Sequence, residues 1–102
     1  NAIFAGLSTS NGCLIHHIGD EGELLNNYLI AEGVSVYGIH YDNDLLALAC
    51  GHDGVLIYQW DGEGLPSFLG RITTSYANKI KVQGNRVFVA TEDGIDIFEI
   101  ER

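Results

Sequence analysis

The chain has 102 residues, 46% of them hydrophobic, and its 5 basic and 14 acidic residues give a formal net charge of −9. This length and apolar content suit one domain with a packed core, and the acidic excess argues against nucleic acid or an anionic membrane surface as a partner. No apolar run approaches the roughly 20 residues that span a bilayer, so no membrane insertion is expected. Because the sequence starts at Asn1 and not at methionine, we expect a processed chain or a piece of a longer one.

The first part of the chain predicts three strands. Residues 1–6 (NAIFAG) and 13–19 (CLIHHIG) are β-type runs on either side of a polar corner. A second corner, residues 19–22, leads to a third run that contains Tyr28, Leu29 and Ile30. Leu24, Leu25, Tyr28 and Leu29 also have helical spacing. We interpret this stretch as a strand, because the equivalent later stretch, residues 64–69, has no such pattern and contains Pro66.

The middle part reads GIHYDND, LLALACGHDG, VLIYQWDGEG and LPSFLGRITT, over residues 38–74. Two of its runs, residues 45–50 and 55–58, are apolar at every position. A strand with one face in water would alternate between apolar and polar residues. We therefore expect a sheet that is packed between two neighbours.

The last part, residues 77–102, predicts three short antiparallel strands. Its apolar residues fall at every second position of their runs, which places them on one side of a strand. These residues are Ile80, Val82, Val87, Val89, Ile95 and Ile97. Gly84-Asn85 and Asp93-Gly94 are dipeptides of the kind that supplies tight hairpin turns.

The three parts align as copies of one motif. Gly12 and Gly54 are 42 residues apart, and Gly54 and Gly94 are 40 residues apart. A period near 40 residues with four short strands is typical of a β-propeller blade. We predict an all-β fold of four-stranded antiparallel blades, about two and a half in a single segment 1–102, with copies over approximately 1–35, 36–75 and 76–102. The outer faces of the first and last blades would be bare and would need cover from other copies or from further sequence.

Two stretches, IHYDNDLLALACGHDGVLIYQW and IKVQGNRVFVATEDGIDIFEI, resemble the LVIVD repeats of YVTN/WD40-like β-propellers. The residues that carry the resemblance best are Gly84-Asn85, Phe88-Val89-Ala90, Asp93-Gly94 and Ile95-Asp96-Ile97. The first copy departs from the pattern through its longer corner, Thr9-Ser10-Asn11-Gly12, and through His16. The resemblance implies a scaffold with a binding surface, no catalytic residues, and a secreted or cell-surface protein.

Corners of a blade that emerge on one face of the disc are the candidate binding residues, because loops gathered on a rigid scaffold usually hold binding sites. The candidates for ligand or partner binding are His52, Asp53, Glu92, Asp93 and Tyr76. The alternative is that the Asp-Gly dipeptides only serve the turns. Nothing in the spacing shows three ligands converging, so no metal site, cofactor or catalytic residue is predicted.

Four other residue sets have structural interpretations. Cys13 and Cys50 are expected to be reduced, packed thiols, whereas a disulfide would indicate an oxidising compartment. His40, Lys79 and Lys81 lie on innermost strands and are expected to line a wet central channel. His16 and His17 are interpreted as strand residues, and Trp60 as a packing residue at a blade corner.

Two functions follow as hypotheses. The first is a non-catalytic protein-interaction or structural scaffold, its ring completed by self-association, by other propeller blades or by missing sequence. The alternative is a part of a propeller enzyme, or of a ligand- or metal-binding ring, that uses the face with His52 and Asp93.

Overall fold

The computed structural model describes residues 2–7, 11–62 and 64–101, which form ten β-strands and no helix. The strands are β1 (Ala2–Leu7), β2 (Gly12–Ile18), β3 (Leu24–Ile30), β4 (Gly38–Asp42), β5 (Leu45–Ala49), β6 (Val55–Gln59), β7 (Ser67–Ile72), β8 (Ala77–Gln83), β9 (Arg86–Thr91) and β10 (Gly94–Glu99). The predicted all-β fold class is confirmed.

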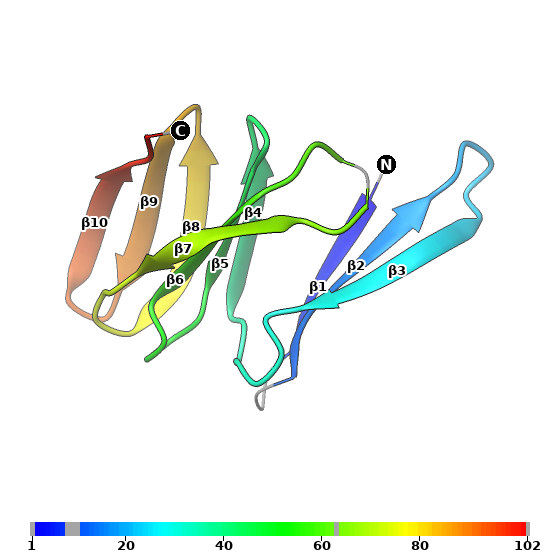
Figure 1. The fold of residues 1–102 in the computed structure, drawn as a ribbon. Coiled ribbons are helices and arrows are strands. Elements are labelled where there is room, and N and C mark those ends of the chain that lie inside the picture. Colours follow the sequence, from blue (N-terminus) through cyan, green and yellow to red (C-terminus); the bar gives the residue numbers. More distant parts are fainter. Residues whose placement is uncertain (1, 8–10, 63, 102) are drawn as a thin grey trace.

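The strands form three antiparallel sheets whose strand order follows the chain (Figure 1). The first sheet contains β1, β2 and β3, the middle sheet contains β4 to β7, and the third sheet contains β8, β9 and β10. The sheets lie face to face in chain order, and β8 packs against β4 and β5. The helical spacing at residues 24–29 does not produce a helix: Ile30 pairs with Cys13, and Tyr28 with Ile15, so β2 supplies the backbone partners of a strand.

One apolar core lies between the first and middle sheets. It contains Cys13, Ile15, Ile30, Val36, Leu46, Leu48, Cys50, Leu56, Tyr58 and Trp60. Leu46, Leu48 and Leu56 occupy alternate positions of β5 and β6, so they share one face of the middle sheet. Both cysteines are buried there as thiols and are not joined in a disulfide, as the sequence predicted.

A second apolar core lies between the middle and third sheets. It contains Leu45, Ala47, Ala49, Val55, Ile57, Ala77, Val82, Val87 and Val89. The middle sheet therefore buries both of its faces, which explains why β5 is apolar at all five positions. The alternation predicted for Val82, Val87 and Val89 is confirmed, since all three point into this core.

Trp60 closes one end of the middle sheet. It is 3% exposed, and its ring centroid lies 5.3 Å from that of Tyr41. The Tyr41 hydroxyl donates a hydrogen bond of 2.9 Å to the Trp60 carbonyl, and Trp60 Nε1 donates one of 3.0 Å to the Gly64 carbonyl. The predicted packing role of Trp60 is confirmed.

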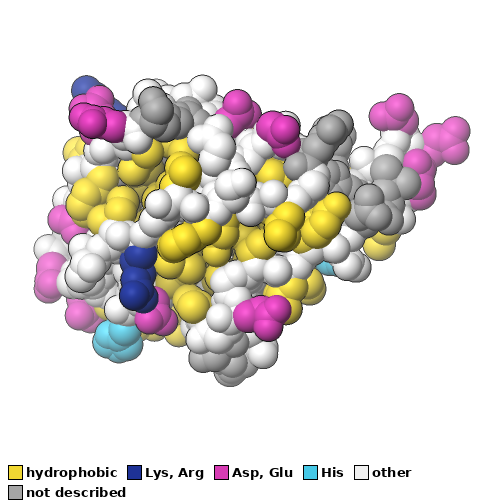
Figure 2. Space-filling model, viewed as in Figure 1, with side chains coloured by type: hydrophobic (Ala, Val, Ile, Leu, Met, Phe, Trp, Pro, Cys, Tyr) yellow, Lys and Arg dark blue, Asp and Glu magenta, His cyan; other side chains and the backbone are white. Residues whose placement is uncertain are grey.

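The outward faces of the first and third sheets keep large apolar side chains at the surface. Leu24 is 68% exposed on β3, and Ile95 and Ile97 are 72% and 61% exposed on β10. Phe68 and Leu69 of β7 are also exposed. Hydrophobic side chains form a band over β7 and toward β10 on the face seen in Figure 2.

Candidate functional site

The predicted corner residues meet at the ends of the middle and third sheets, where the backbone joins the two corners. The N–H of Gly51 donates to the carbonyl of Ala77 over 2.8 Å, and the N–H of Ala77 donates back over 3.0 Å. The N–H of Glu92 donates a hydrogen bond of 3.2 Å to the carbonyl of Tyr76. These bonds fix the segment before β8 against the corner that follows β5 and the corner that follows β9.

An aromatic cluster stands on this backbone frame. The His52 and Tyr76 ring centroids are 4.6 Å apart in an edge-to-face arrangement, and those of Tyr37 and Tyr76 are 5.6 Å apart. Gly51 makes the close approach possible, since a Cβ atom there would lie 2.8 Å from Tyr37 and 3.0 Å from Tyr76. We name Tyr37, His52, Tyr76 and Glu92 the corner cluster.

The electrostatics of the corner cluster centre on the Tyr76 phenol. Its hydrogen bond with Tyr37, its loss of hydration and the nearby negative charge of Glu92 raise the pKa of Tyr76. The phenol therefore holds its proton to a higher pH than a free tyrosine side chain does. Exposed aromatic rings beside a carboxylate can attract a cationic group through their negative faces.

Two of the predicted site residues have other partners. The Asp53 carboxylate forms an ion pair of 3.7 Å with Arg71 of β7, and both side chains are about half exposed. The N–H of Asp93 donates a hydrogen bond of 3.1 Å to Thr91 Oγ1, which in turn donates to the Gly94 carbonyl over 3.2 Å. Asp93 thus belongs to the turn between β9 and β10, which is the structural alternative that the Asp-Gly dipeptide left open.

The structure brings His52, Tyr76 and Glu92 together and adds Tyr37, which was not among the predicted residues. Tyr37 directly precedes β4 as Tyr76 precedes β8. The sequence thus places an aromatic residue directly before the first strand of the middle sheet and of the third sheet. This repetition could have pointed to Tyr37. In residues 2–7, 11–62 and 64–101, no group of three or more His, Cys, Asp or Glu side chains is arranged to hold a metal ion.

His40 has a different environment from the one expected. Its Nδ1 atom accepts a hydrogen bond of 2.8 Å from the backbone N–H of Val82. The side chain therefore bridges β4 and β8 and does not simply line a channel. His16 lies in β2, as predicted, and so does His17, whose side chain falls outside the described residues.

Comparisons of the chain with protein-family models, with curated proteins and with solved structures found no match. The part of the chain that the structure describes contains no helix long and apolar enough to cross a membrane.

Proposed function

We propose that this chain is a non-catalytic protein-interaction or structural scaffold made of β-propeller blade repeats of the LVIVD type. In this proposal each sheet is a blade, and further blades cover the outward faces of the first and third sheets. They come from other copies of the chain or from additional repeats. The observation that carries the proposal is the contrast between matching positions of the middle and third sheets.

Matching positions can be assigned from the strand ladders. Val55 pairs with Ala49 next to the corner of the middle sheet, and Ile95 pairs with Ala90 next to the corner of the third sheet. A backbone bond also recurs: the N–H of Trp60 donates to the Asp44 carbonyl over 2.9 Å, and the N–H of Ile100 donates to the Asn85 carbonyl over 2.7 Å. By this alignment Ile95 and Ile97 are the counterparts of Val55 and Ile57.

These counterparts differ in their exposure to solvent. Val55 and Ile57 are 0% and 3% exposed because the third sheet covers them, whereas Ile95 and Ile97 are more than half exposed. Phe88 and Ala90 extend the same outward face of the third sheet, with Lys79 and Lys81 beside them. Contiguous exposed apolar surface on a sheet is typical of an interface. A further sheet packed on this face would give Ile95 the environment that Val55 already has.

The test is the absolute mass in solution, measured by light scattering on a sizing column over a hundredfold range of concentration. A discrete oligomer that persists on dilution, and that dissociates in an Ile95→Lys, Ile97→Lys double variant, supports the proposal. Leu65→Lys, at an exposed apolar position in the corner between β6 and β7 and outside both outward faces, is the control. A wild-type chain that stays a stable monomer at every concentration would contradict self-association as the way in which the blades are covered.

The corner cluster favours a second candidate function, a ligand-binding ring that uses this face. The supporting observation is the contact of Tyr76 with both His52 and Tyr37 next to the Glu92 carboxylate. A screen of cationic ligands and divalent metals by nuclear magnetic resonance, with the wild-type chain and with His52→Ala and Glu92→Gln variants, tests it. Binding that is unchanged in both variants would remove this candidate.

A further inference from the structure

The third sheet has one fewer strand than the middle sheet. The strand order of the third sheet is β10-β9-β8, so in the described part of the chain β10 pairs only with β9. In the middle sheet the matching strand, β6, pairs with β5 on one side and with β7 on the other. An edge strand presents a row of backbone N–H and C=O groups that can template another strand.

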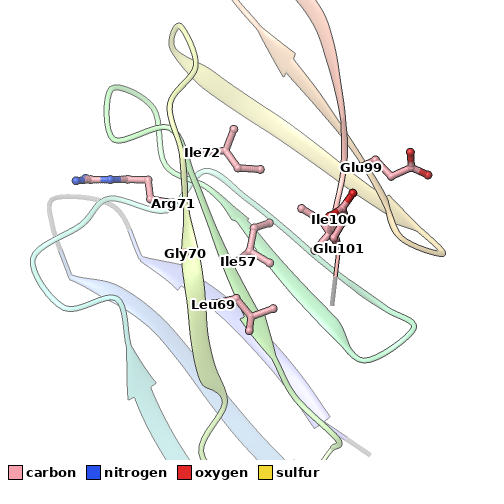
Figure 3. A pocket seen from close by; sticks show the side chains of 8 residues that line it. All are labelled: Ile57, Leu69, Gly70, Arg71, Ile72, Glu99, Ile100 and Glu101. Atoms are coloured by element: carbon pink, nitrogen blue, oxygen red, sulfur yellow. The ribbon is translucent and has the colours of Figure 1, made fainter.

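An open cavity with apolar and charged lining lies beside this edge. Its volume is about 290 Å³, and it is lined by Ile57, Leu69, Gly70, Arg71, Ile72, Glu99, Ile100 and Glu101. Ile57, Leu69 and Ile72 lie on the side that faces Ile100, whereas Arg71 points away from it (Figure 3). The cavity therefore joins the β7 side of the middle sheet to the end of β10, where a fourth strand of the third sheet would run.

The corner glycines indicate independently that, in the described part of the chain, the outer edge of the third sheet is open. A Cβ atom at Gly12 would collide with the Ile30 carbonyl at the end of β3, and one at Gly54 would collide with the Ile72 carbonyl of β7. In the first and middle sheets, the carbonyl of the last residue of β3 or β7 thus packs directly against the corner glycine. At Gly94, the matching corner of the third sheet, no described atom lies within 4 Å of the same position.

The pairing of β6 with β7 supplies a register for an added strand. Tyr58 pairs with Phe68, Leu56 with Arg71, and Val55 with Ile72. The counterparts of Tyr58, Leu56 and Val55 on β10 are Phe98, Asp96 and Ile95. The added strand would therefore place one residue opposite each of these three side chains.

The three side chains define the chemistry of the partner. Phe98 favours an aromatic residue, as Tyr58 contacts Phe68 edge to face with centroids 5.3 Å apart. The exposed carboxylate of Asp96 favours a basic residue, and Glu101 adds negative charge near the end of the same edge, whereas Glu99 is paired with Arg86 over 3.9 Å. Ile95 favours an aliphatic residue, which would cover part of its exposed surface.

We propose that the edge of β10 binds, by β-strand addition, an extended segment of a partner protein with an aromatic, a basic and an aliphatic residue in the spacing aromatic-x-x-basic-aliphatic. Main-chain hydrogen bonds supply affinity in this binding mode, and the alternate side chains supply specificity. This inference names the partner class of the proposed scaffold. It concerns the edge of the third sheet, whereas self-association concerns the outward face of that sheet.

The chain provides a probe with this spacing in its own β7 sequence. A labelled synthetic peptide with the sequence of residues 65–72 (LPSFLGRI) is titrated with the whole protein, and binding is followed by fluorescence anisotropy. Saturable binding is expected to weaken about fivefold or more in an Asp96→Lys variant, because an opposite-charge cross-strand pair becomes a like-charge pair. A peptide with glutamate in place of its arginine should recover affinity for that variant. Glu21→Lys, in the exposed corner between β2 and β3, is the charge-matched control and should bind like the wild type.

A Gly94→Ala variant tests the position of the added strand. Its Cβ atom would meet the carbonyl of an added strand, as a Cβ atom at Gly54 would meet that of Ile72. The variant should lose peptide binding; because alanine at φ +135° also strains this corner, circular dichroism checks that the variant is folded. No binding by the wild type, equal binding by Asp96→Lys, or full binding by a folded Gly94→Ala variant would overturn the inference. The oligomer mass is measured without peptide, so the proposed function can fail while this inference stands, and the reverse also holds.

Discussion

The backbone N–H of Val82 donates a hydrogen bond of 2.8 Å to Nδ1 of His40, which joins β8 of the third sheet to β4 of the middle sheet. Two further contacts continue along the same pair of strands. The Gly84 N–H donates to Asp42 Oδ2 over 3.3 Å, and Asn43 Nδ2 donates to Asn85 Oδ1 over 3.4 Å. Polar side chains of β4 and of the corner after it thus bond to the edge of β8 and to the corner that follows β8. This arrangement protects an edge that would otherwise be open to another strand.

Replacement of His40 should destabilise the fold through this bond. His40→Ala leaves the Val82 N–H without its acceptor next to the buried Val82 side chain. We expect the free energy of unfolding to fall by about 1–3 kcal/mol, the usual cost of an unsatisfied buried donor. Urea denaturation measures the change. Lys81→Ala is the matched control, since Lys81 is the counterpart of His40 in the third sheet and its side chain is exposed. A change within about 0.5 kcal/mol in the free energy of unfolding is expected for this variant. Equal losses in the two variants would show that the bond contributes nothing specific.

A cavity in the first core should be far more costly than an equal truncation at the surface. Leu48 of β5 is 0% exposed and contributes to the core between the first and middle sheets. Leu48→Ala is expected to lower the free energy of unfolding by about 2–5 kcal/mol. Leu24→Ala removes the same atoms from a side chain that is 68% exposed, and its effect should stay within about 0.5 kcal/mol. Thermal melts of both variants check the contrast, which would be absent if the sheets did not pack on Leu48.

The sequence predicts the sheets because their strand signals are local. The alternation of Val87 and Val89 and the unbroken apolar run at residues 45–49 identify strands with one face or both faces buried, and both patterns are found in the structure. The turn dipeptide at Asp93-Gly94 likewise marks the end of β9. These features depend on side-chain period and on turn chemistry, which a single sequence displays.

Contacts between sheets could not be predicted in the same way. The bond from Val82 to His40 joins residues 42 apart in the sequence and depends on the relative offset of β4 and β8. No local pattern in the sequence encodes that offset. The ion pair of Asp53 with Arg71 depends on the register of β7, which a bulge between Ile57 and Tyr58 shifts. Tyr37 joins the corner cluster for a similar reason, because only the packed sheets bring it to Tyr76.

The corner glycines should differ in their tolerance of a methyl group. Gly54 and Gly84 both adopt positive φ, +76° and +61°, so alanine is strained at either position, by about 1–2 kcal/mol. At Gly54 the new Cβ atom would also collide with the Ile72 carbonyl, whereas no described atom lies within 4 Å at Gly84. Gly54→Ala should therefore lose more stability than Gly84→Ala in urea denaturation. Equal losses would mean that β7 does not press against the corner as the structure describes.

Burial of the Cys50 thiol should make stability depend on alkaline pH. Burial, followed by the negative charge of Asp53, raises the pKa of Cys50 to about 12. The thiol therefore ionises more readily in the unfolded chain, near pH 8.5, than in the folded one. Its contribution to stability is complete below that pH and is lost as pH rises toward 12, with a slope of up to about 1.4 kcal/mol per pH unit.

The thiol can be tested in two ways. The native protein should react with a disulfide reagent at pH 8 far more slowly at Cys50 than the urea-unfolded chain does. Between pH 9 and 11 the free energy of unfolding should fall more steeply in the wild type than in a Cys50→Ala variant. The difference between the two proteins is the informative quantity, because burial also raises the pKa of Tyr41 and Tyr58, which titrate in the same direction in both. Parallel pH profiles, or rapid labelling of native Cys50, would contradict the burial of this thiol between the first and middle sheets.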